Sequence, residues 1–121
     1  MTNAAAPRLG DLERAVMDAL WDSDAPRTAY ELQAELDRGL ASTTVLTVLG
    51  RLERKGFVTV DRGSRPHHYQ PVSSRAEHMA ELMHDVLRGG STDRQAVLER
   101  FVNGVSDTDA DVLRKLLTRG D

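Results

Sequence analysis

The chain has 121 residues, of which 29% are charged, and a formal net charge of -3. This length fits one domain or a small domain with an appendage, and the slightly acidic balance excludes a uniformly basic nucleic-acid binder while leaving room for a local basic patch. Because the chain has no cysteine and no run of about 18 apolar residues, we exclude disulfides, thiolate nucleophiles and cysteine metal sites and expect a cytoplasmic protein without membrane insertion.

The N-terminal part predicts two helices. Residues 1–7 indicate a disordered lead without the apolar core of a signal peptide. A first helix is predicted over residues 11–22, with Glu13 in its first turn. Its buried stripe has helical spacing and consists of Leu12, Ala15, Val16, Ala19 and Leu20. Residues 23–27 predict a turn, and the capping box over residues 28–31 begins a second helix with Ala29, Leu32 and Leu36 on one face and Gly39 at its end.

Residues 42–55 (STTVLTVLGRLERK) predict a third helix with two distinct faces, capped by Ser42 and ended by Gly56. Its apolar stripe at positions i, i+3, i+4 and i+7 consists of Val45, Val48, Leu49 and Leu52. The opposite face carries Thr43, Thr44, Thr47, Gly50, Arg51 and Arg54. Short threonine side chains can meet base edges or thymine methyl groups in the DNA major groove, and arginine can reach phosphate or guanine. This face indicates a DNA-recognition helix, although an ordinary half-buried surface helix is the alternative.

A β-hairpin is predicted directly after this helix. Residues 57–60 and 67–71 predict two strands, joined by a turn over residues 61–65. Helix-turn-helix followed at once by a hairpin is the winged-helix arrangement. From Arg51 to Arg65 there are five Arg or Lys residues and two acids. This segment would therefore attract a polyanion while the rest of the chain repels it.

The remaining residues, 73–121, predict three helices that form a region separate from the winged helix of residues 1–72. A second capping box lies at residues 74–77, while Ser91 and Ser106 can cap the next two helices. A segment this small rarely buries enough surface to stand alone, so we expect it to dimerise. The alternative is a monomer whose tail folds back on the winged helix. The expected interface residues are Met79, Met83, Val86, Leu98, Phe101, Leu113, Leu116 and Leu117.

Three segments, LGDLERAVMDALW, TAYELQAEL and TTVLTVLGRLERKGFVTVDRGSRPHHYQPV, closely resemble the BlaI/MecI/CopY (penicillinase repressor) family of bacterial winged-helix regulators. The resemblance covers residues 9–117. It implies a homodimer that binds a palindromic operator upstream of β-lactam resistance genes and represses their transcription. It also implies that Thr44 and Thr47 touch bases, with Arg51 near the DNA backbone. The candidate DNA-contacting residues are Thr43, Thr44, Thr47, Arg51, Arg54, Arg62, Arg65 and His67.

This sequence departs from the family pattern at three places, and each limits which family properties can be expected of this chain. Thr43 stands where some members have a DNA-contacting lysine, which leaves base preference there open. Copper-responsive members have a cysteine-rich C-terminus, which this chain lacks. Members relieved by proteolysis are cut at an Asn-Phe bond, whereas Arg100 precedes Phe101 here. We take Arg100–Phe101 as the candidate cleavage site, with a membrane sensor-protease or a downstream protease as the candidate partner.

Other function classes have weaker support. A metal- or small-ligand-responsive repressor remains an alternative, but His67 and His68 alternate across a strand, and His78 and His84 are not at the i, i+4 spacing of helix ligands. Both wing histidines can instead be phosphate contacts or plain surface. A winged helix that binds only protein would not need a basic hairpin. No enzyme and no cofactor are expected, because no nucleophile elbow or glycine-rich phosphate loop occurs.

Overall fold

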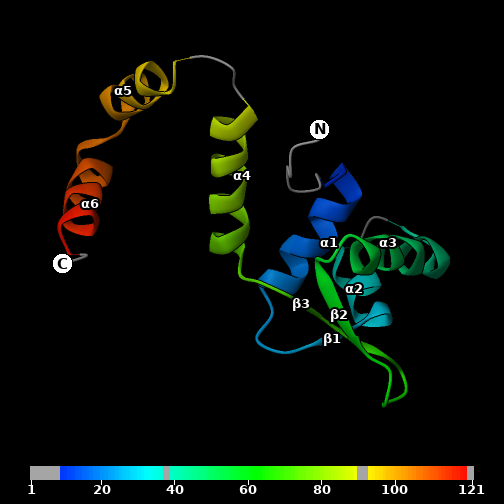
Figure 1. Ribbon diagram of the computed structural model, residues 1–121. Helices are drawn as coiled ribbons and strands as arrows, with labels where there is room; N and C mark the ends of the chain where they lie inside the picture. The colour runs from blue at the N-terminus through cyan, green and yellow to red at the C-terminus, as the bar shows by residue number, and fades with distance from the viewer. Residues whose placement is uncertain (1–8, 37–38, 90–92, 120–121) are drawn as a thin grey trace.

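The computed structural model describes residues 9–36, 39–89 and 93–119 (Figure 1). Within these residues, helices and short strands follow one another as α1 (Asp11–Trp21), β1 (Arg27–Thr28), α2 (Ala29–Leu36), α3 (Ser42–Arg54), β2 (Val58–Asp61), β3 (His68–Pro71), α4 (Arg75–Gly89), α5 (Arg94–Gly104) and α6 (Asp107–Thr118). The prediction of a mostly helical chain with a small β wing is confirmed. The predicted lead over residues 1–7 and the predicted cap Ser91 lie outside the described residues.

Helices α1, α2 and α3 and the sheet share one hydrophobic core. Its fully buried large side chains are Val16, Met17, Leu20, Leu32, Val45, Leu49 and Leu52. All four residues of the predicted α3 stripe are buried, which turns the threonine face outward. In α1 the predicted stripe is only partly right, because Leu12 and Ala15 are half-buried and Met17, which was not predicted, is fully buried. Each such side chain contributes roughly 1.5–3 kcal/mol, so this core fixes the orientation of α3.

The sheet has three strands, whereas a two-stranded hairpin was predicted. Strand β1 lies at the end of the segment predicted as a turn and pairs antiparallel with β3, giving the order β1-β3-β2. Tyr69 of β3 is the partner of Arg27 on one side and of Val60 on the other. A strand of two residues has no alternation to detect, so periodicity could not have predicted it. Strand β1 connects the start of α2 to the base of the wing.

The helix ends agree with the sequence in most places. Gly56 has φ +86° and ends α3 in the left-handed region as predicted. Ser42 is the first residue of α3 and not its cap, because extended Ala41 takes the cap position and its carbonyl accepts from the amide of Thr44. Asp93 caps α5, accepting from two backbone amides.

Of the four predicted serine or threonine caps that the structure describes, three are present and only Ser42 is not. In the first capping box Thr28 accepts from the Glu31 amide and Glu31 from the Thr28 amide. Ser74 and Glu77 repeat this arrangement at the start of α4. Ser106 accepts from an amide in the first turn of α6. These local patterns were therefore sufficient to place the starts of three helices.

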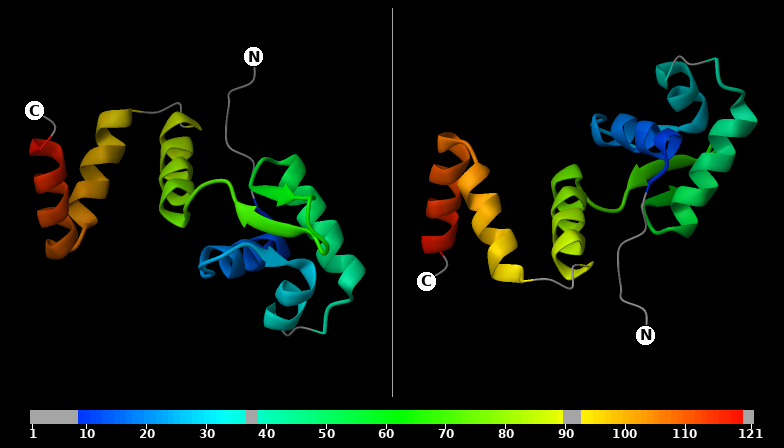
Figure 2. Two further views of the ribbon diagram at one scale, coloured as in Figure 1. Left: turned by 90° about the horizontal axis from the view of Figure 1, so that it is seen from below. Right: turned by 90° about the horizontal axis from the view of Figure 1, so that it is seen from above.

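Helix α4 leaves the winged helix at a joint around His78. The His78 ring is buried, with its centroid 5.3 Å from that of Trp21 and 5.4 Å from that of Phe57. The Trp21 indole donates to the Ser73 carbonyl at 2.9 Å, and Arg75 pairs with an acid of α1. Helices α5 and α6 lie side by side beyond α4, away from the winged helix (Figure 2). No described helix combines the length and apolar character that a membrane span requires.

Candidate nucleic-acid interface

The outward face of α3 holds most of the candidate DNA-contacting residues. Thr43, Thr47 and Arg54 are exposed along its centre. Arg51, also exposed, lies on the flank toward α1, where its charge acts on Glu13. Thr44 is half-buried and lies on the same flank as Arg51, because the two residues are separated by about two helical turns. The structure thus brings these residues together on one ridge of the molecule.

The Thr47 hydroxyl is already used as a donor inside α3. It donates to the Thr43 carbonyl at 2.9 Å, a bond that threonine often makes within helices. The hydroxyl oxygen and the methyl group remain available on the surface. An acceptor at this place can take a hydrogen bond from adenine N6 or cytosine N4, and the methyl group can meet a thymine methyl.

Gly50 leaves a gap in side chains at the middle of the same face. A Cβ built there would lie 3.6 Å from the nearest Arg54 nitrogen, which is ordinary contact. The protein's own packing therefore does not require glycine, although glycine within a helix costs about 0.5–1 kcal/mol relative to alanine. Absence of a side chain here allows another molecule to approach the α3 backbone closely.

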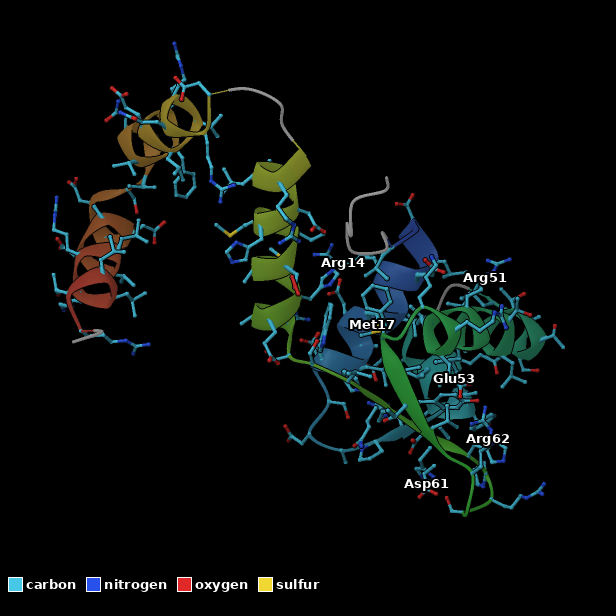
Figure 3. The ribbon with its side chains drawn as sticks, viewed as in Figure 1. Arg14, Met17, Arg51, Glu53, Asp61 and Arg62 are labelled. Carbon is cyan, nitrogen blue, oxygen red and sulfur yellow. The ribbon has the colours of Figure 1, made fainter. Side chains whose placement is uncertain are left out.

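The candidate residues of the wing have different surroundings. Arg62 forms two bonds with the Glu53 carboxylate of α3, at 2.7 and 2.9 Å, so its guanidinium points toward the helix (Figure 3). This pairing lowers the pKa of Glu53 and raises the pKa of Arg62. Arg65, in contrast, is exposed and makes no ion pair within the described part of the chain. Arg65 is therefore the freer of the two wing cations.

A groove of about 370 Å³ separates α2 and α3 from the wing. It is lined by Ala29, Tyr30, Gln33, Ser42, Leu46, Arg65, Pro66, His67 and Tyr69. Tyr30 is 78% exposed and Leu46 is 49% exposed, and neither was among the sequence candidates. Leu46 is an apolar residue off the buried stripe of α3, and this signal could have identified it. His68 lines a different groove behind the wing, as expected for alternating residues of a strand.

The comparisons with known proteins agree with this geometry. A family model described as Penicillinase repressor matches residues 9–119. The chain belongs to the penicillinase repressor family. It is 48% identical over 118 residues to "Transcriptional regulator BlaI" of Mycobacterium tuberculosis, in strains CDC 1551 / Oshkosh and ATCC 25618 / H37Rv, covering 94% of this chain and 86% of the relative. The family resemblance is thereby confirmed, and the family is one of transcriptional regulators and not of enzymes.

Two solved structures are similar in fold. Transcriptional regulator Tm0710 from Thermotoga maritima has a TM-score of 0.51 and 18% identity, over 88% of this chain and 70% of that chain. A MarR family protein from Bacillus stearothermophilus has a TM-score of 0.50 and 19% identity, over 90% and 70% respectively. At this identity the likeness concerns the fold alone, and it confirms the winged helix.

In this penicillinase repressor family member, an ion pair between a buried carboxylate and a partly exposed lysine holds α3 against α1. Lys55 Nζ lies 2.7 Å from Glu13 Oε1, which also accepts from the Gly10 amide at 2.8 Å. The bond from Lys55 is the largest cause that lowers the pKa of Glu13 below 4.5, and burial opposes it. The sequence identified Glu13 only as a first-turn acid, since its partner lies 42 residues away. The pair fixes the end of α3 that carries Arg51 and Arg54.

The repressor's C-terminal helices expose the residues predicted for dimerisation. Exposed side chains are Met79, Met83, Val86, Leu98, Phe101, Leu116 and Leu117, and Leu113 is half-buried. An apolar groove of about 230 Å³ between α4 and α5 is lined by Met83, Val86, Leu87, Val97, Leu98 and Phe101. Exposed apolar patches of this kind mark interaction sites. The candidate cleavage bond Arg100–Phe101 lies inside α5.

The histidines of the repressor's α4 are not arranged as metal ligands. His78 is enclosed between Trp21 and Phe57, while His84 is exposed further along the helix. Among residues 9–36, 39–89 and 93–119, no three His, Asp or Glu side chains are grouped so as to hold a metal ion. His78 has a structural explanation in the joint between α4 and the winged helix.

Proposed function

We propose that this chain is a homodimeric repressor that binds a palindromic DNA operator through two copies of α3. The observation that carries the proposal is a ridge of exposed Thr43, Thr47 and Arg54 with half-buried Gly50 between them, which is backed by a buried apolar stripe. The core holds this ridge outward without using its side chains for packing. Membership of the penicillinase repressor family and the regulator name of the 48% identical relative support a role on DNA.

On this proposal α3 enters the major groove. Its 13 residues span about 20 Å at 1.5 Å per residue, and a groove about 12 Å wide admits one helix. Thr43, Thr44 and Thr47 contact base edges, and Gly50 lets the backbone come close. Arg51 and Arg54 contact phosphate from the second half of the helix. Such contacts fix the register on the duplex while the threonines select sequence.

The wing holds the flanking DNA. Arg65 and His67 line the same groove as Tyr30 and Leu46, so a DNA strand that lies along this groove would meet all four. Arg65 supplies charge to a phosphate, and the Tyr30 hydroxyl can donate to another. Leu46 offers an apolar surface to a sugar or a thymine methyl group. Tyr30 and Leu46 are therefore added to the proposed interface.

The second copy of the chain covers the C-terminal helices. Helices α5 and α6 have 11 and 12 residues and bury none of them, and isolated helices of this length are marginal in water. A twofold partner offers the same apolar residues in return, which satisfies both chains at once. A dimer through residues 73–121 would present two α3 helices about one DNA turn apart or a multiple of it, matching a palindrome.

Repression follows if the bound dimer excludes polymerase from a promoter. The family name points to genes of β-lactam resistance as targets. Such a repressor acts in the cytoplasm.

A cut at Arg100–Phe101 would divide α5 in the middle of the proposed dimer surface. Each winged helix would then bind a half-site alone and lose the effective concentration that the dimer provides. Cleavage by a membrane sensor-protease or a downstream protease would require α5 to open locally.

Two variants that each remove one arginine test the interface. Arg65→Ala should weaken binding to all duplexes alike and reduce the slope of log affinity against log salt by about 0.9 per subunit. Arg114→Ala is the matched control, because Arg114 is exposed on α6 and pairs with Asp111 there. Equal effects of both variants, or a loss confined to one sequence in Arg65→Ala, would contradict the proposed role of the wing.

A further inference from the structure

One carboxylate, that of Glu53, lies on α3 where DNA phosphates would repel it. Glu53 leaves α3 on the side opposite Arg51 and faces the wing, as Figure 3 shows. It is 35% exposed on a helix that we place in the major groove. A free carboxylate beside two rows of phosphates would weaken binding to every sequence. The position therefore requires either another residue type or a neutralising partner.

Arg62 is that partner and joins two separate elements. Its two terminal nitrogens lie 2.7 and 2.9 Å from the two oxygens of Glu53. A paired fork of this kind is directional as well as attractive, because both planar groups must face each other. The bond thus connects the recognition helix to the wing at a defined angle.

The contact lies where the backbone ladder of the wing stops. The last paired residues are Asp61 and His68, so residues 62–67, which we call the wing tip, have no strand partners. Within the wing, the Gly63 amide donates to the Asp61 side chain at 2.9 Å, and the Ser64 hydroxyl lies 3.2 Å from His68 Nδ1, but neither contact reaches α3. The Arg62 bond is what ties the tip to α3, and the tip carries Arg65 and His67.

We propose that Arg62 is a positioning residue: its ion pair with Glu53 neutralises the recognition helix and fixes the wing tip, and Arg62 does not itself contact DNA. The inference rests on the proposed DNA-binding function and replaces the sequence prediction that Arg62 is a DNA contact. It differs from a competing arrangement in which Arg62 leaves Glu53 and binds phosphate when DNA arrives.

The two arrangements predict opposite effects of Glu53→Gln. If the pair positions the wing tip, the variant loses about fivefold in affinity per subunit for a duplex selected by the wild-type protein, while binding to a scrambled duplex tightens. If Arg62 binds phosphate, removing its competitor tightens binding to both duplexes. Asp111→Asn removes one charge from an exposed pair on α6 and is the matched control, with no expected change for either duplex.

Two Arg62 variants complete the test. Arg62→Lys keeps a charge that can reach phosphate but loses the fork, so the selected duplex should bind about fivefold more weakly, whereas a phosphate contact would retain its affinity. The exchange Glu53→Arg with Arg62→Glu restores the pair in reverse and should recover wild-type affinity and salt slope to within about twofold. If the exchanged protein binds the selected duplex more weakly than Glu53→Arg alone or Arg62→Glu alone, the inference is overturned.

Duplex selection by the wild-type protein distinguishes failure of the positioning role of Arg62 from failure of the proposed DNA-binding function. Thermal melting of each variant first establishes that it folds. If the wild type selects no duplex, the proposed function fails and the inference fails with it. If the wild type selects a duplex but Glu53→Gln binds it more tightly, the function stands and the positioning role of Arg62 is wrong.

Discussion

Replacing Lys55 by methionine should destabilise the fold because it leaves the Glu13 carboxylate buried without its cation. The Glu13 side chain is only 7% exposed, whereas that of Lys55 is 34% exposed. Removing one partner of a fully buried pair costs about 3–5 kcal/mol, and an exposed pair contributes about 0–1 kcal/mol. Since water screens the lysine end here, we expect Lys55→Met to lower the free energy of unfolding by about 1.5–2.5 kcal/mol at pH 7.

The stability lost in Lys55→Met should depend on pH, and it should be larger at neutral pH than at acidic pH. The folded pKa of Glu13 is lowered from 4.5, so the pair stabilises the wild type fully above pH 4.5 and the stabilisation is lost as pH falls through the folded pKa. The variant lacks this contribution. The difference in unfolding free energy between wild type and Lys55→Met should therefore shrink below pH 4.5.

Urea unfolding followed by fluorescence measures both quantities, because Trp21 is the one tryptophan of the chain. The control is Glu13→Gln with Lys55→Met, in which a neutral amide can still accept from the Gly10 amide, so most of the loss should be recovered. A loss below about 0.5 kcal/mol, or one that is the same at pH 7 and pH 4, would refute the argument from burial.

Three further predictions follow from the site and the joint. Thr47→Val removes the acceptor but keeps the methyl group, so it should lose about 1 kcal/mol on sites that offer adenine or cytosine there; an unchanged binding profile removes Thr47 from the interface. Burial, and secondarily the charge of Arg14, lower the pKa of His78 from 6.5, so docking of α4 is fully stabilised above pH 6.5 and weakens below it. Trp21 fluorescence should report this change, and its persistence in His78→Phe would assign it to another group. Phe101→Asp should split the proposed dimer in sedimentation, since an unpaired buried charge is costly, and a variant that stays dimeric would place Phe101 outside the interface.

The sequence was most informative where the relevant pattern is local. The spacing of Val45 and its partners identified the buried side of α3, and the outward threonines followed from the same helical period. Capping boxes at Thr28 and Ser74 placed two helix starts because each box lies within four residues. The candidate residues on α3 therefore follow from the sequence alone.

What the sequence did not show are contacts between distant elements. Glu13 was identified only as a first-turn acid, because its partner Lys55 is distant in the sequence, at the end of α3. Arg62 appeared as a free wing cation because no periodic pattern reveals Glu53 as its partner. His78 is one of two α4 histidines in the sequence, and only the structure shows that Trp21 and Phe57 enclose it. Such pairings depend on how elements pack, and hydrophobic period carries no information about them.

The measurement that tests the central claim most directly is a selection of random DNA duplexes by the purified protein, followed by binding measurements at two salt concentrations. We expect enrichment of one palindrome, with affinity that falls steeply as salt rises, at a slope of about -0.9 for each phosphate neutralised. Recovery of no common sequence, together with affinity that does not change with salt, would contradict a repressor that reads DNA through α3.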